Sequence, residues 1–546
     1  MPESAKLLQS HGFAPLQAEL LGRRGITDRE AADRFLNPSP DQFHDPYLLA
    51  GMDRAIERLV AARDGQEKVA IVGDYDVDGV SATALLDAVF GACGIATLAI
   101  VPHRMKEGYG FQPVHVERAL QEGCGVVVTA DCGTTSVAAV GAAIEGDLDV
   151  IVTDHHLPGA GFPEQALQIN PKQEHCHYPY PELCGAGLAL KLCLALLDRC
   201  GRKNDLHALL RIACLGTIAD MVPLTEENRA IAALGLKALG DTRSAGLRAL
   251  IHQSGVRLPV TAEDVGFRLG PRLNAAGRLG SAESALELLL CRDVPRAAEL
   301  ASQLDQWNKQ RQGEELRVVE QARERIAGQD PLPPILVAWD ESWHRGVVGI
   351  AAGRLMREFQ RPTLLFALDG ESAVGSGRSL SGVDLHGFLS EWKDDMDRFG
   401  GHSQAVGLTV AKSSLEDLRS QWQEEAQKWP PHLFERIYEY ELTVAPRDVT
   451  DQLLDELEAL QPHGQQNPQP LLRVGPLNRS GSLRFFGKDH LSGQAKGPQG
   501  APVRLLGWRW RSRASELTKD FEVLAYLERD TYRGGPVLRL VDCRPA

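Results

Sequence analysis

The chain has 546 residues, of which 43% are hydrophobic, and a formal net charge of −14. Its length indicates three or four domains. No apolar run approaches the roughly eighteen residues of a membrane span, and residues 1–6 lack the basic-then-apolar pattern of a secretory signal. These features argue against a membrane or secreted protein. The ten cysteines form no Cys-x-x-Cys pair, which is typical of reduced thiols in a cytoplasmic protein.

The charge is unevenly distributed along the chain. Residues 471–546 contain fourteen Lys and Arg against seven Asp and Glu, a net charge of +7, so residues 1–470 carry about −21. An acidic body with a basic tail is typical of a chain with an appended module that binds a polyanion.

The predicted elements begin with a short helical lead-in over residues 1–50 and a helix over 52–63. Residues 69–72 are apolar and predict a short buried strand, which Asp74, Asp76 and Asp78 follow at alternate positions. Three carboxylates this close together repel one another, which indicates a bound divalent cation.

Two other interpretations of this acidic loop compete with a metal site. An EF-hand calcium loop needs a preceding helix and a glutamate at its twelfth position, where this chain has a predicted strand and Leu85. A solvated acidic turn is the second alternative. The residues further along the chain make it the less favoured one.

The pattern of a strand followed by a polar loop then repeats. Strands are predicted over residues 96–101, 125–129 and 149–153, and helix-sized segments alternate with them, so the sheet should be parallel and covered on both faces. Ligands bind such sheets beyond the carboxyl ends of the strands. The loops beyond these strand ends hold Arg104, Asp131, Asp154, His155 and His156. Three strands that end in acid or imidazole favour one shared site over three unrelated helix caps.

Helices should dominate residues 185–254. Within them Asp220 lies among apolar neighbours, where an unpaired charge is costly. A metal partner explains it better than a capping role before Pro223. Further on, residues 298–327 predict a long amphipathic helix that links two domains. Its buried side should carry Leu300, Leu304, Trp307 and Leu316.

Several motifs combine small residues with Arg, Asn or His, which suits backbone that closely approaches an anion. One motif spans residues 270–278, and two more lie at residues 375–379 and 400–403, in a second predicted α/β unit. Their candidate anion-binding residues are Asn274, Arg278, Ser376, Arg378 and His402. Tight turns are the alternative for the two glycine motifs of the second unit.

The C-terminal part of the chain predicts a small β-barrel that follows a linker over residues 461–470. Within it, residues 508–513 alternate Trp with Arg and Ser. In a strand, this period would place Trp508 and Trp510 on one face, with Arg509 and Arg511 on the other. One face would then stack bases while the other meets phosphates; a Trp pair packed in the core is the alternative.

The candidate site offers carboxylate oxygens and imidazole nitrogens but no thiolate, which suits Mn²⁺ or Mg²⁺ better than zinc. The number of carboxylates exceeds what one ion needs, so we expect two ions. Two neighbouring metals activate a water and stabilise the leaving oxygen in an in-line displacement at phosphorus. The residues themselves therefore predict a two-metal phosphoesterase with a basic tail for a polyanionic substrate.

Four motifs in this order resemble those of the DHH phosphoesterase superfamily. They are Asp-Tyr-Asp-Val-Asp-Gly from Asp74, Thr-Ala-Asp-Cys-Gly from Thr129, Thr-Asp-His-His from Thr153 and Gly-Thr-Ile-Ala-Asp-Met-Val-Pro-Leu from Gly216. Together with Gly-Pro-Arg-Leu-Asn-Ala-Ala-Gly-Arg, Gly-Gly-His-Ser and the basic tail, they are most similar to the bacterial family of single-strand-specific 5′→3′ DNA exonucleases.

The resemblance implies a role for each candidate residue. Metal ligands would be Asp74, Asp76, Asp78, Asp131, His155 and Asp220, with Asp131 bridging two ions of Mn²⁺ or Mg²⁺. The catalytic residues would be Asp131, His156 and Asp154, with His156 on the scissile phosphate. Arg104, Ser376 and Arg378 would hold the 5′-terminal phosphate, and Asn274, Arg278 and His402 the nearby backbone. Trp508, Arg509 and Arg511 would guide the strand along an OB-fold.

The resemblance also implies a domain order and a biological setting. We expect a lead-in over residues 1–50, a DHH catalytic domain over 51–290, a linking helix over 291–330, a DHH-associated α/β domain over 331–460 and an OB-fold over 461–546. Single-stranded DNA would be the substrate in DNA repair and recombination, with a single-stranded-DNA-binding protein and recombination helicases as partners. A DHH phosphodiesterase for short oligonucleotides or cyclic dinucleotides, or a non-catalytic replication scaffold, are the alternatives.

Overall fold

The structure is a computed structural model that describes residues 3–103, 107–108, 110–159, 162–163, 165–203 and 205–546. It divides into two compact units, which are described separately. The first comprises Met1–Gly270, Leu286–Ala297 and Glu439–Ala546, and the second Pro271–Ala285 and Ala298–Tyr438. None of the helices in the described ranges is both long enough and apolar enough to cross a membrane.

The centre of the first unit is a parallel five-stranded sheet with the order β2-β1-β3-β4-β5. Its strands are β1 Lys68–Gly73, β2 Ala96–Ile100, β3 Cys124–Ala130, β4 Asp149–Thr153 and β5 Leu167–Ile169. The strand positions predicted from the sequence are confirmed. The apolar runs of β1, β3 and β4 are buried on both faces of the sheet, whereas β2, at the edge, is mostly half-buried.

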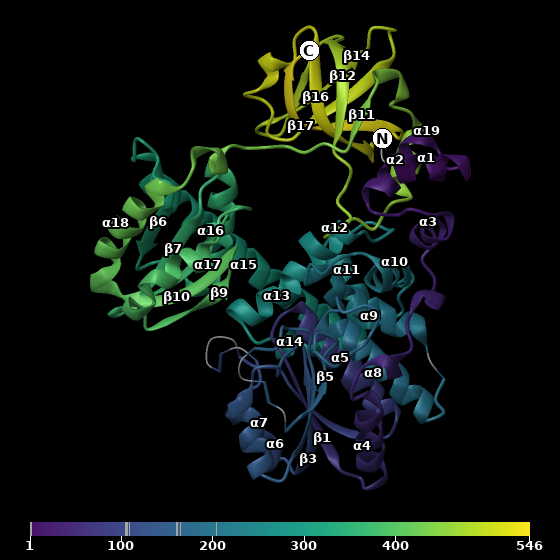
Figure 1. Ribbon diagram of the computed structural model, residues 1–546, viewed down its shortest axis with the longest axis vertical. Coiled ribbons are helices and arrows are strands. Elements are labelled where there is room, and N and C mark those ends of the chain that lie inside the picture. The colour runs from purple at the N-terminus through teal and green to yellow at the C-terminus, as the bar shows by residue number, and fades with distance from the viewer. Residues whose placement is uncertain (1–2, 104–106, 109, 160–161, 164, 204) are drawn as a thin grey trace. The chain divides into compact units, whose positions relative to one another are not determined.

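Helices cover both faces of this sheet. They are α4 Met52–Asp64, α5 Val77–Ala92, α6 Pro113–Gln121, α7 Val137–Glu145 and α8 Gly185–Arg199, which contact its strands. Helix α9 Leu206–Ala219 packs on α5 and α8, α10 Glu226–Gly240 packs on α9, and α11 Ala245–Gln253 follows. Figure 1 shows α6 and α7 on one side of the strands, where their apolar residues share a core with β1 and β3. Helix α5 is apolar on all sides and is almost entirely buried, because it lies between the sheet and α8 and α9.

The second unit contains a mixed sheet with the order β6-β7-β8-β10-β9. Its strands are β6 Leu336–Asp340, β7 Thr363–Asp369, β8 Ser372–Arg378, β9 Arg398–His402 and β10 Ala405–Ala411. Its helices include α16 Arg345–Phe359, α17 Leu385–Leu389 and α18 Leu415–Glu425. One core packs α16 and the long helix α15 (Val294–Ala327) on the sheet, and another packs α18 through the buried Trp422.

The long helix α15 corrects one expectation about its buried side. Leu300 and Leu304 are buried, whereas Leu316 is 44% exposed. The buried series continues through Arg311, Val318 and Val319. Leu316 lies off that series, because residues three or four apart share a helix face.

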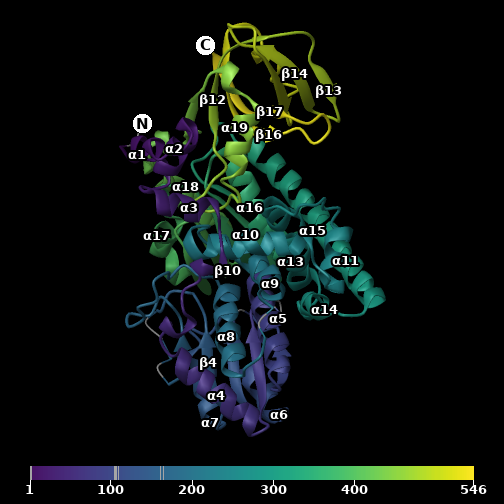
Figure 2. The same ribbon diagram turned by 90° about the vertical axis from the view of Figure 1, so that its right-hand side faces the viewer.

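A β-barrel lies at the C-terminal end of the first unit. Its strands are β11 Leu442–Val444, β12 Leu472–Arg479, β13 Arg484–Phe486, β14 His490–Lys496, β15 Pro502–Gly507, β16 Phe521–Arg529 and β17 Pro536–Pro545. The order β12-β16-β17-β15-β14 closes on itself through pairing of β12 with β14. Figure 2 shows β13 beside β14 at one side of the barrel. The predicted fold class, two α/β domains with a linking helix and a C-terminal OB-fold, is confirmed.

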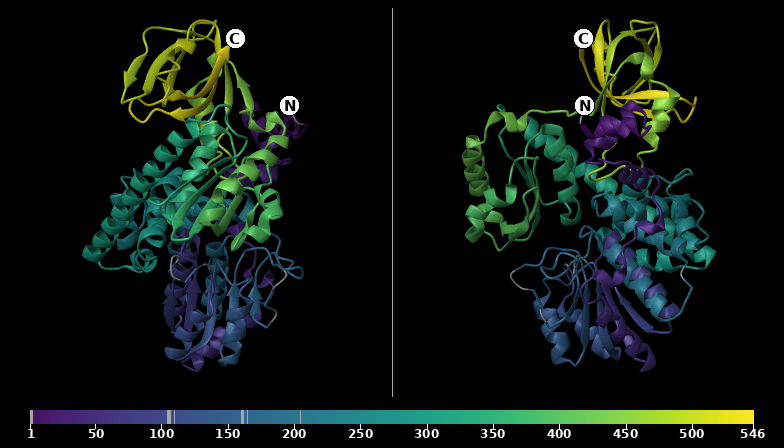
Figure 3. Two further views of the ribbon diagram at one scale, coloured as in Figure 1. Left: turned by 90° about the vertical axis from the view of Figure 1, so that its left-hand side faces the viewer. Right: turned by 45° about the vertical axis from the view of Figure 1, so that its right-hand side comes forward.

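The N-terminal helices share the hydrophobic core of this barrel. Helix α1 Glu3–Ser10 contributes Leu8, α2 Pro15–Arg23 contributes Leu20 and Leu21, and α3 Arg29–Leu36 contributes Ala32 to a cluster that contains Leu472 and Phe521 of the barrel strands. Figure 3 shows these helices, in purple, next to the barrel, in yellow. The two ends of the chain therefore fold together.

The segment predicted as a linker is fixed in place by hydrogen bonds. Asn467 is fully buried, and its side-chain amide donates to the carbonyls of Leu460 and Pro462. The buried guanidinium of Arg229, on α10, donates to the carbonyls of Leu460, Gln461 and Pro462. The bonds of Arg229 join the segment before the barrel to helix α10.

Candidate metal centre

The acidic loop after β1 forms the start of helix α5. Asp76 is the N-cap of this helix, and its Oδ1 accepts hydrogen bonds from the backbone amides of Asp78 and Gly79 at 2.9 and 3.1 Å. Asp74 lies at the strand end, with its own amide bonded to the carbonyl of Ala130 in β3. A strand end and a helix start therefore hold three carboxylates in a short span.

Asp78 is buried against the beginning of another helix. Its Oδ2 accepts a hydrogen bond from the amide of Gly185 at 2.7 Å and its Oδ1 one from Ala186 at 2.8 Å, both in the first turn of α8. The positive end of a helix favours a carboxylate. Burial, and then the neighbouring charge of Asp76, nevertheless raise the pKa of Asp78 to about 6.

Asp131 and His155 lie against each other at the ends of β3 and β4. Asp131 has a left-handed backbone with φ of 66°, and its Oδ1 lies 3.1 Å from Nε2 of His155. These two atoms are buried, and neither makes a hydrogen bond. Burial and the surrounding carboxylates raise the pKa of Asp131 well above its usual range, and burial lowers that of His155. Such a site is costly without a cation.

Asp220 reaches the same place from the end of α9. Its Oδ2 lies 3.7 Å from Nε2 of His155, and that nitrogen is 3.9 Å from Oδ2 of Asp78. Burial, followed by the charge of Asp78, raises the pKa of Asp220 to about 7. The predicted convergence of strand ends and Asp220 is therefore seen in the structure.

The potential ligand atoms of this centre fall into three groups of three, and the atoms of each group lie within 4.8 Å of one another. Asp74, Asp76 and Asp131 form the first group, Asp78, His155 and Asp220 the second, and Asp131, His155 and His156 a third that shares a member with each of the others. The contact between Asp131 and His155 joins the first two groups. Oxygen and imidazole donors in this number fit two hard or borderline divalent cations.

Asp154 belongs to none of these groups and instead holds His156. Its Oδ1 lies 2.7 Å from Nδ1 of His156, and its two oxygens accept the backbone amides of Thr134, His155 and His156. Burial alone would raise the pKa of Asp154, but His156 and the hydrogen bonds from Thr134 lower it to about 2. Burial alone would lower the pKa of His156, but the contact with Asp154 raises it. The imidazole is thereby fixed in orientation.

Two glycines that the sequence analysis did not single out make room for the carboxylates. A Cβ on Gly185 would lie 2.4 Å from Cβ of Asp131, and one on Gly216 would lie 2.3 Å from Oδ1 of Asp78. Distances this short exclude any side chain. Gly216 lies inside the apolar helix α9, where glycine is unfavourable, and that was the available signal. Gly185 is the first residue of α8.

Three candidate phosphate-binding residues of the second unit, Ser376, Arg378 and Arg278, lie against α16. Ser376 and Arg378 lie on β8, and Gly349 of α16 allows both to approach, since a Cβ there would lie 3.2–3.3 Å from their side chains. Arg278 donates from Nη1 to the carbonyl of Gly346 at 3.0 Å. Asn274 belongs to α13 Gly270–Leu279, and His402 ends β9 in an exposed position. Arg104 lies outside the described residues.

The residues after β15 correct the predicted strand over 508–513. The strand ends at Gly507, and Arg509 adopts a left-handed conformation with φ of 62°, so the chain turns back. A Cβ on Gly507 would lie 2.6 Å from that of Trp510. Trp510 is consequently 4% exposed, whereas Trp508 is 50% exposed. The two Trp residues therefore have different roles.

Trp508 belongs to an exposed aromatic group that the sequence analysis missed. Its ring is edge-on to those of Phe486 and His490, with centroids 5.7 and 4.8 Å away. The guanidinium of Arg511 lies 5.0 Å from the ring of Phe485, which is 42% exposed. Exposed aromatic rings beside an arginine offer stacking and charge together.

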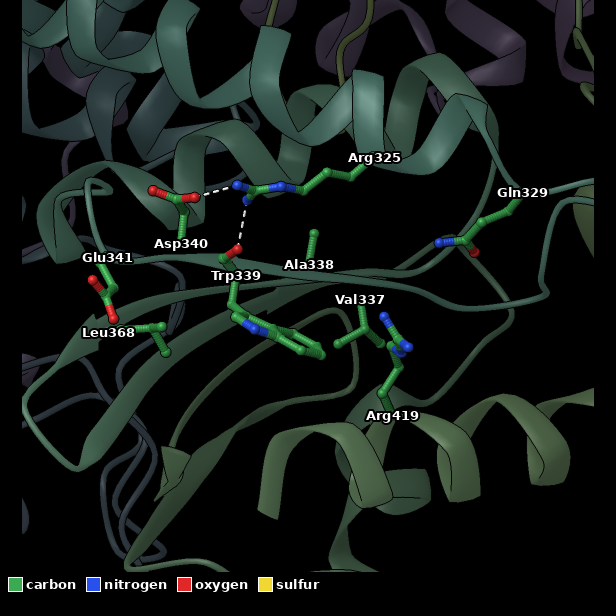
Figure 4. A pocket seen from close by; sticks show the side chains of 9 residues that line it. All are labelled: Arg325, Gln329, Val337, Ala338, Trp339, Asp340, Glu341, Leu368 and Arg419. Atoms are coloured by element: carbon green, nitrogen blue, oxygen red, sulfur yellow. Dashed lines mark hydrogen bonds and ion pairs between the residues drawn. The ribbon is translucent and has the colours of Figure 1, made fainter. Parts of the chain in front are cut away.

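A cavity of about 400 Å³ lies beside the edge strand β6 in the second unit. Figure 4 shows Arg325 reaching toward Asp340 and the carbonyl of Trp339, with Arg419 on the other side. None of the candidate site residues that the structure describes lines this cavity. The cavity belongs to the second unit, whereas the candidate metal ligands belong to the first.

Three family models match successive parts of the chain. They are the N-terminal domain of the DHH family over residues 68–217, the DHHA1 domain over 332–428 and the RecJ OB domain over 440–541. A protein of Dickeya dadantii named single-stranded-DNA-specific exonuclease RecJ is 34% identical, and the match covers 89% of this chain and 88% of that protein. The chain belongs to the RecJ family.

Other RecJ proteins show the same relationship. The RecJ of Bacillus subtilis is 39% identical, in a match that covers 85% of this chain and 59% of the length of that protein. The crystal structure of RecJ from Thermus thermophilus in complex with Mn²⁺ matches with a TM-score of 0.83 at 29% identity, covering all of this chain and 78% of that one. A structure of the same RecJ with Mg²⁺ matches with a TM-score of 0.78.

Proposed function

We propose that this chain is a metal-dependent exonuclease that degrades single-stranded DNA from the 5′ end and releases 5′-mononucleotides during DNA repair and recombination. The observation that carries the proposal is the buried pair of Asp131 and His155, whose facing atoms lack hydrogen bonds and join two groups of ligands. Membership of the RecJ family supports the substrate class.

The centre would hold two ions of Mn²⁺ or Mg²⁺. Asp74 and Asp76 would bind one ion, Asp78, His155 and Asp220 the other, and Asp131 would bridge them. When bound, such ions activate a water and stabilise the leaving oxygen at phosphorus. The binding of Mn²⁺ and of Mg²⁺ by the Thermus RecJ supports this assignment.

His156 would stabilise the charge that develops on the scissile phosphate. Asp154 accepts a hydrogen bond from Nδ1 and so holds the ring at a fixed angle. The pKa of His156 is raised by Asp154, which favours the protonated, donating form. In this scheme Asp154 is a positioning residue.

The second unit would determine that cleavage begins at the 5′ end of the strand. Ser376 and Arg378, with Arg104, would bind the 5′-terminal phosphate, while Asn274, Arg278 and His402 would bind neighbouring phosphates. Arginine beside glycine-rich backbone suits phosphate recognition. These roles rest on the family pattern and on the clustering of Ser376 and Arg378 at Gly349.

The barrel would guide the strand towards the metal centre. Trp508 would stack on bases, and Arg509 and Arg511 would meet phosphates. A single-stranded-DNA-binding protein and recombination helicases are proposed as partners on family membership alone. The ten cysteines are free thiols, which supports a location in the cytoplasm.

A labelled 5′-phosphorylated single strand tests the proposal directly. With Mn²⁺ or Mg²⁺ we expect labelled mononucleotides from the first time point, whereas duplex DNA and chelated reactions remain intact. Preferential cleavage of dinucleotides or cyclic dinucleotides would instead assign a small-substrate phosphodiesterase. Strand binding without any metal-dependent cleavage would assign a scaffold.

A further inference from the structure

Two large, exposed apolar residues each follow a residue of the metal centre directly in the sequence. Leu157 follows His156 and is 73% exposed, and Met221 follows Asp220 and is 70% exposed. Single exposed apolar residues are common on protein surfaces. These two are distinguished by their position, because each is attached to a residue of the candidate metal cluster.

The backbone of Met221 is held in an unfavourable conformation. Its φ is 60°, in the left-handed region, immediately after Asp220 caps the end of α9. Glycine or asparagine usually occupies this position at a helix end, because a side chain is strained there. A methionine therefore reduces stability at this position, and a functional role for the side chain accounts for it.

Both side chains stand on backbone that is fixed by hydrogen bonds. The buried side-chain amide of Asn170 donates to the carbonyl of His156 at 2.8 Å, directly before Leu157. The hydroxyl of Tyr180 and the amide of Asn228 donate to the carbonyl of Pro223 at 3.1 Å each, two residues after Met221. The two apolar groups are thus presented from rigid positions, which limits the entropy lost on contact with a ligand.

The chemistry of the site specifies what these groups would touch. A metal-bound phosphate in a DNA strand carries a deoxyribose and a base on either side, and both present apolar faces. Leu has no hydrogen-bonding group and Met has only a weak acceptor sulfur, so neither distinguishes one base from another by hydrogen bonds. The Met side chain is also flexible enough to fit all four bases. An apolar contact that does not depend on the identity of the base suits an enzyme that must accept any DNA sequence.

We infer that Leu157 and Met221 contact the sugar and base of the nucleotide next to the scissile phosphate, and so hold the strand at the metal centre regardless of sequence. This inference rests on the proposed function. The two residues are substrate-binding residues, and neither takes part in the chemical step.

The conformation of Met221 provides an unusually clean test. Met221→Gly removes the side chain at a position where glycine is the preferred residue, so the temperature of unfolding should stay the same or rise. We expect KM for a single strand to rise about fivefold to tenfold, from the loss of apolar contact area, with kcat nearly unchanged. Leu157→Ala should act in the same direction, and Leu258→Ala, at an exposed leucine that is not adjacent to any cluster residue, should have no effect.

Substrates with a single abasic nucleotide locate the contact. An abasic site should be placed at each of the first few positions from the 5′ end in turn. At one position the abasic site should raise KM for the wild type, and the Met221→Gly penalty should fall below about twofold there, since the partner of the side chain is already missing.

Two results would overturn the inference while leaving the proposed function intact. One is an unchanged KM for Met221→Gly and Leu157→Ala with an active wild type. The other is an equal penalty on intact and abasic strands at every position. If the wild type itself fails to cleave single strands with either metal, the proposed function fails, and this inference fails with it.

Discussion

Nε2 of His155 lies 3.1 Å from Oδ1 of Asp131, and the two atoms make no hydrogen bond. Each is buried, and each belongs to a group of potential ligands. A ring nitrogen and a carboxylate oxygen that approach without hydrogen-bond geometry are both directed elsewhere, and a cation is the ligand that satisfies both. This pair leads to the first prediction.

Asp131→Asn should reduce cleavage to background while DNA binding without metal is retained. The amide keeps the shape of the side chain but loses the charge that a bridging ligand needs. Calorimetric titration with Mn²⁺ should show weaker binding and fewer sites than in the wild type. Asp198→Asn, at an exposed position on α8, is the matched control. Full activity of Asp131→Asn would exclude a bridging role.

Gly216→Ala should disrupt the metal centre, because Gly216 lies on α9, the helix that ends at Asp220. The added methyl carbon would lie 2.3 Å from Oδ1 of Asp78 and 2.6 Å from Cβ of Ala186, so Asp78 or α8 must shift. We expect a loss of about 1–3 kcal/mol in the free energy of unfolding, from overpacking, and loss of cleavage. The measurements are chemical denaturation and an assay on labelled strands.

The control for this variant is Gly91→Ala in α5, where an added Cβ meets nothing within 4 Å. It should raise the free energy of unfolding by about 0.5–1 kcal/mol, because alanine favours the helix over the unfolded chain. If Gly216→Ala behaved like this control, the close approach of Asp78 to α9 would not be needed for stability or cleavage.

Arg378→Ala should weaken recognition of a 5′-terminal phosphate. Loss of a charge-assisted contact costs on the order of 2 kcal/mol, or some thirtyfold in affinity. The preference for 5′-phosphorylated over 5′-hydroxyl strands should fall by that factor, as measured by KM on paired substrates. Lys428→Ala, an exposed residue paired with Glu425, controls for the loss of a positive charge. An equal loss on both substrates would assign Arg378 to general backbone binding.

Substitutions on the surface of the barrel are a better test of its DNA contacts than truncation. Removal of residues 471–546 would expose Leu8, Leu20 and Leu21, which share the core of the barrel. Trp508→Ala should weaken binding of long strands by about 1–3 kcal/mol, from lost stacking. Arg511→Ala should flatten the slope of log affinity against log salt by about 0.7.

The comparison for these two variants is a short strand. Oligonucleotides too short to reach the barrel should be cleaved equally well by the wild type and both variants. If neither variant changes binding of long strands, the exposed aromatic group of the barrel serves another purpose, such as contact with a partner protein.

Protonation of His463 should destabilise the protein in mild acid. Burial, with the nearby charges of Arg24 and Arg229, lowers the pKa of His463 to about 4 in the folded state, against 6.5 for an ordinary histidine. Between these values the unfolded chain binds more protons, so stability falls as the pH decreases from about 6.5 to about 4. The full shift corresponds to at most about 3 kcal/mol, and less because the ring keeps part of its surface in water.

His463→Gln removes this titration. The free energy of unfolding of the variant should vary less with pH than that of the wild type across this window, as measured by urea denaturation at several pH values. Identical pH dependence in the two proteins would show that His463 does not carry the effect.

The sequence by itself determined the parallel sheet, the order of the acidic motifs and their meeting at one edge. The strands are uninterrupted apolar runs, and parallel strands all place their carboxyl ends on the same side. Asp74, Asp131 and His155 could therefore be assigned to one site, although some 80 residues separate the first from the last. The chemistry of their side chains then indicated divalent metals without any coordinates.

The tertiary structure alone decided which residues support that site. The amides of Gly185 and Ala186 and the space left by Gly216 come from helices far along the chain, and no periodic pattern marks a backbone amide or a missing side chain. Sequence alone also could not show that Asp154 contacts His156 while His155 joins the potential metal ligands, because adjacent residues can point in different directions.

The same limit applies to the two ends of the chain. Helices α1 to α3 looked like a separate lead-in, yet their apolar residues complete the core of a barrel that begins more than four hundred residues later. Trp508 and Trp510 looked equivalent, yet a turn after Gly507 buries one and exposes the other. Local sequence fixes which side chains need burial, whereas the partner that buries them is chosen by packing between distant segments.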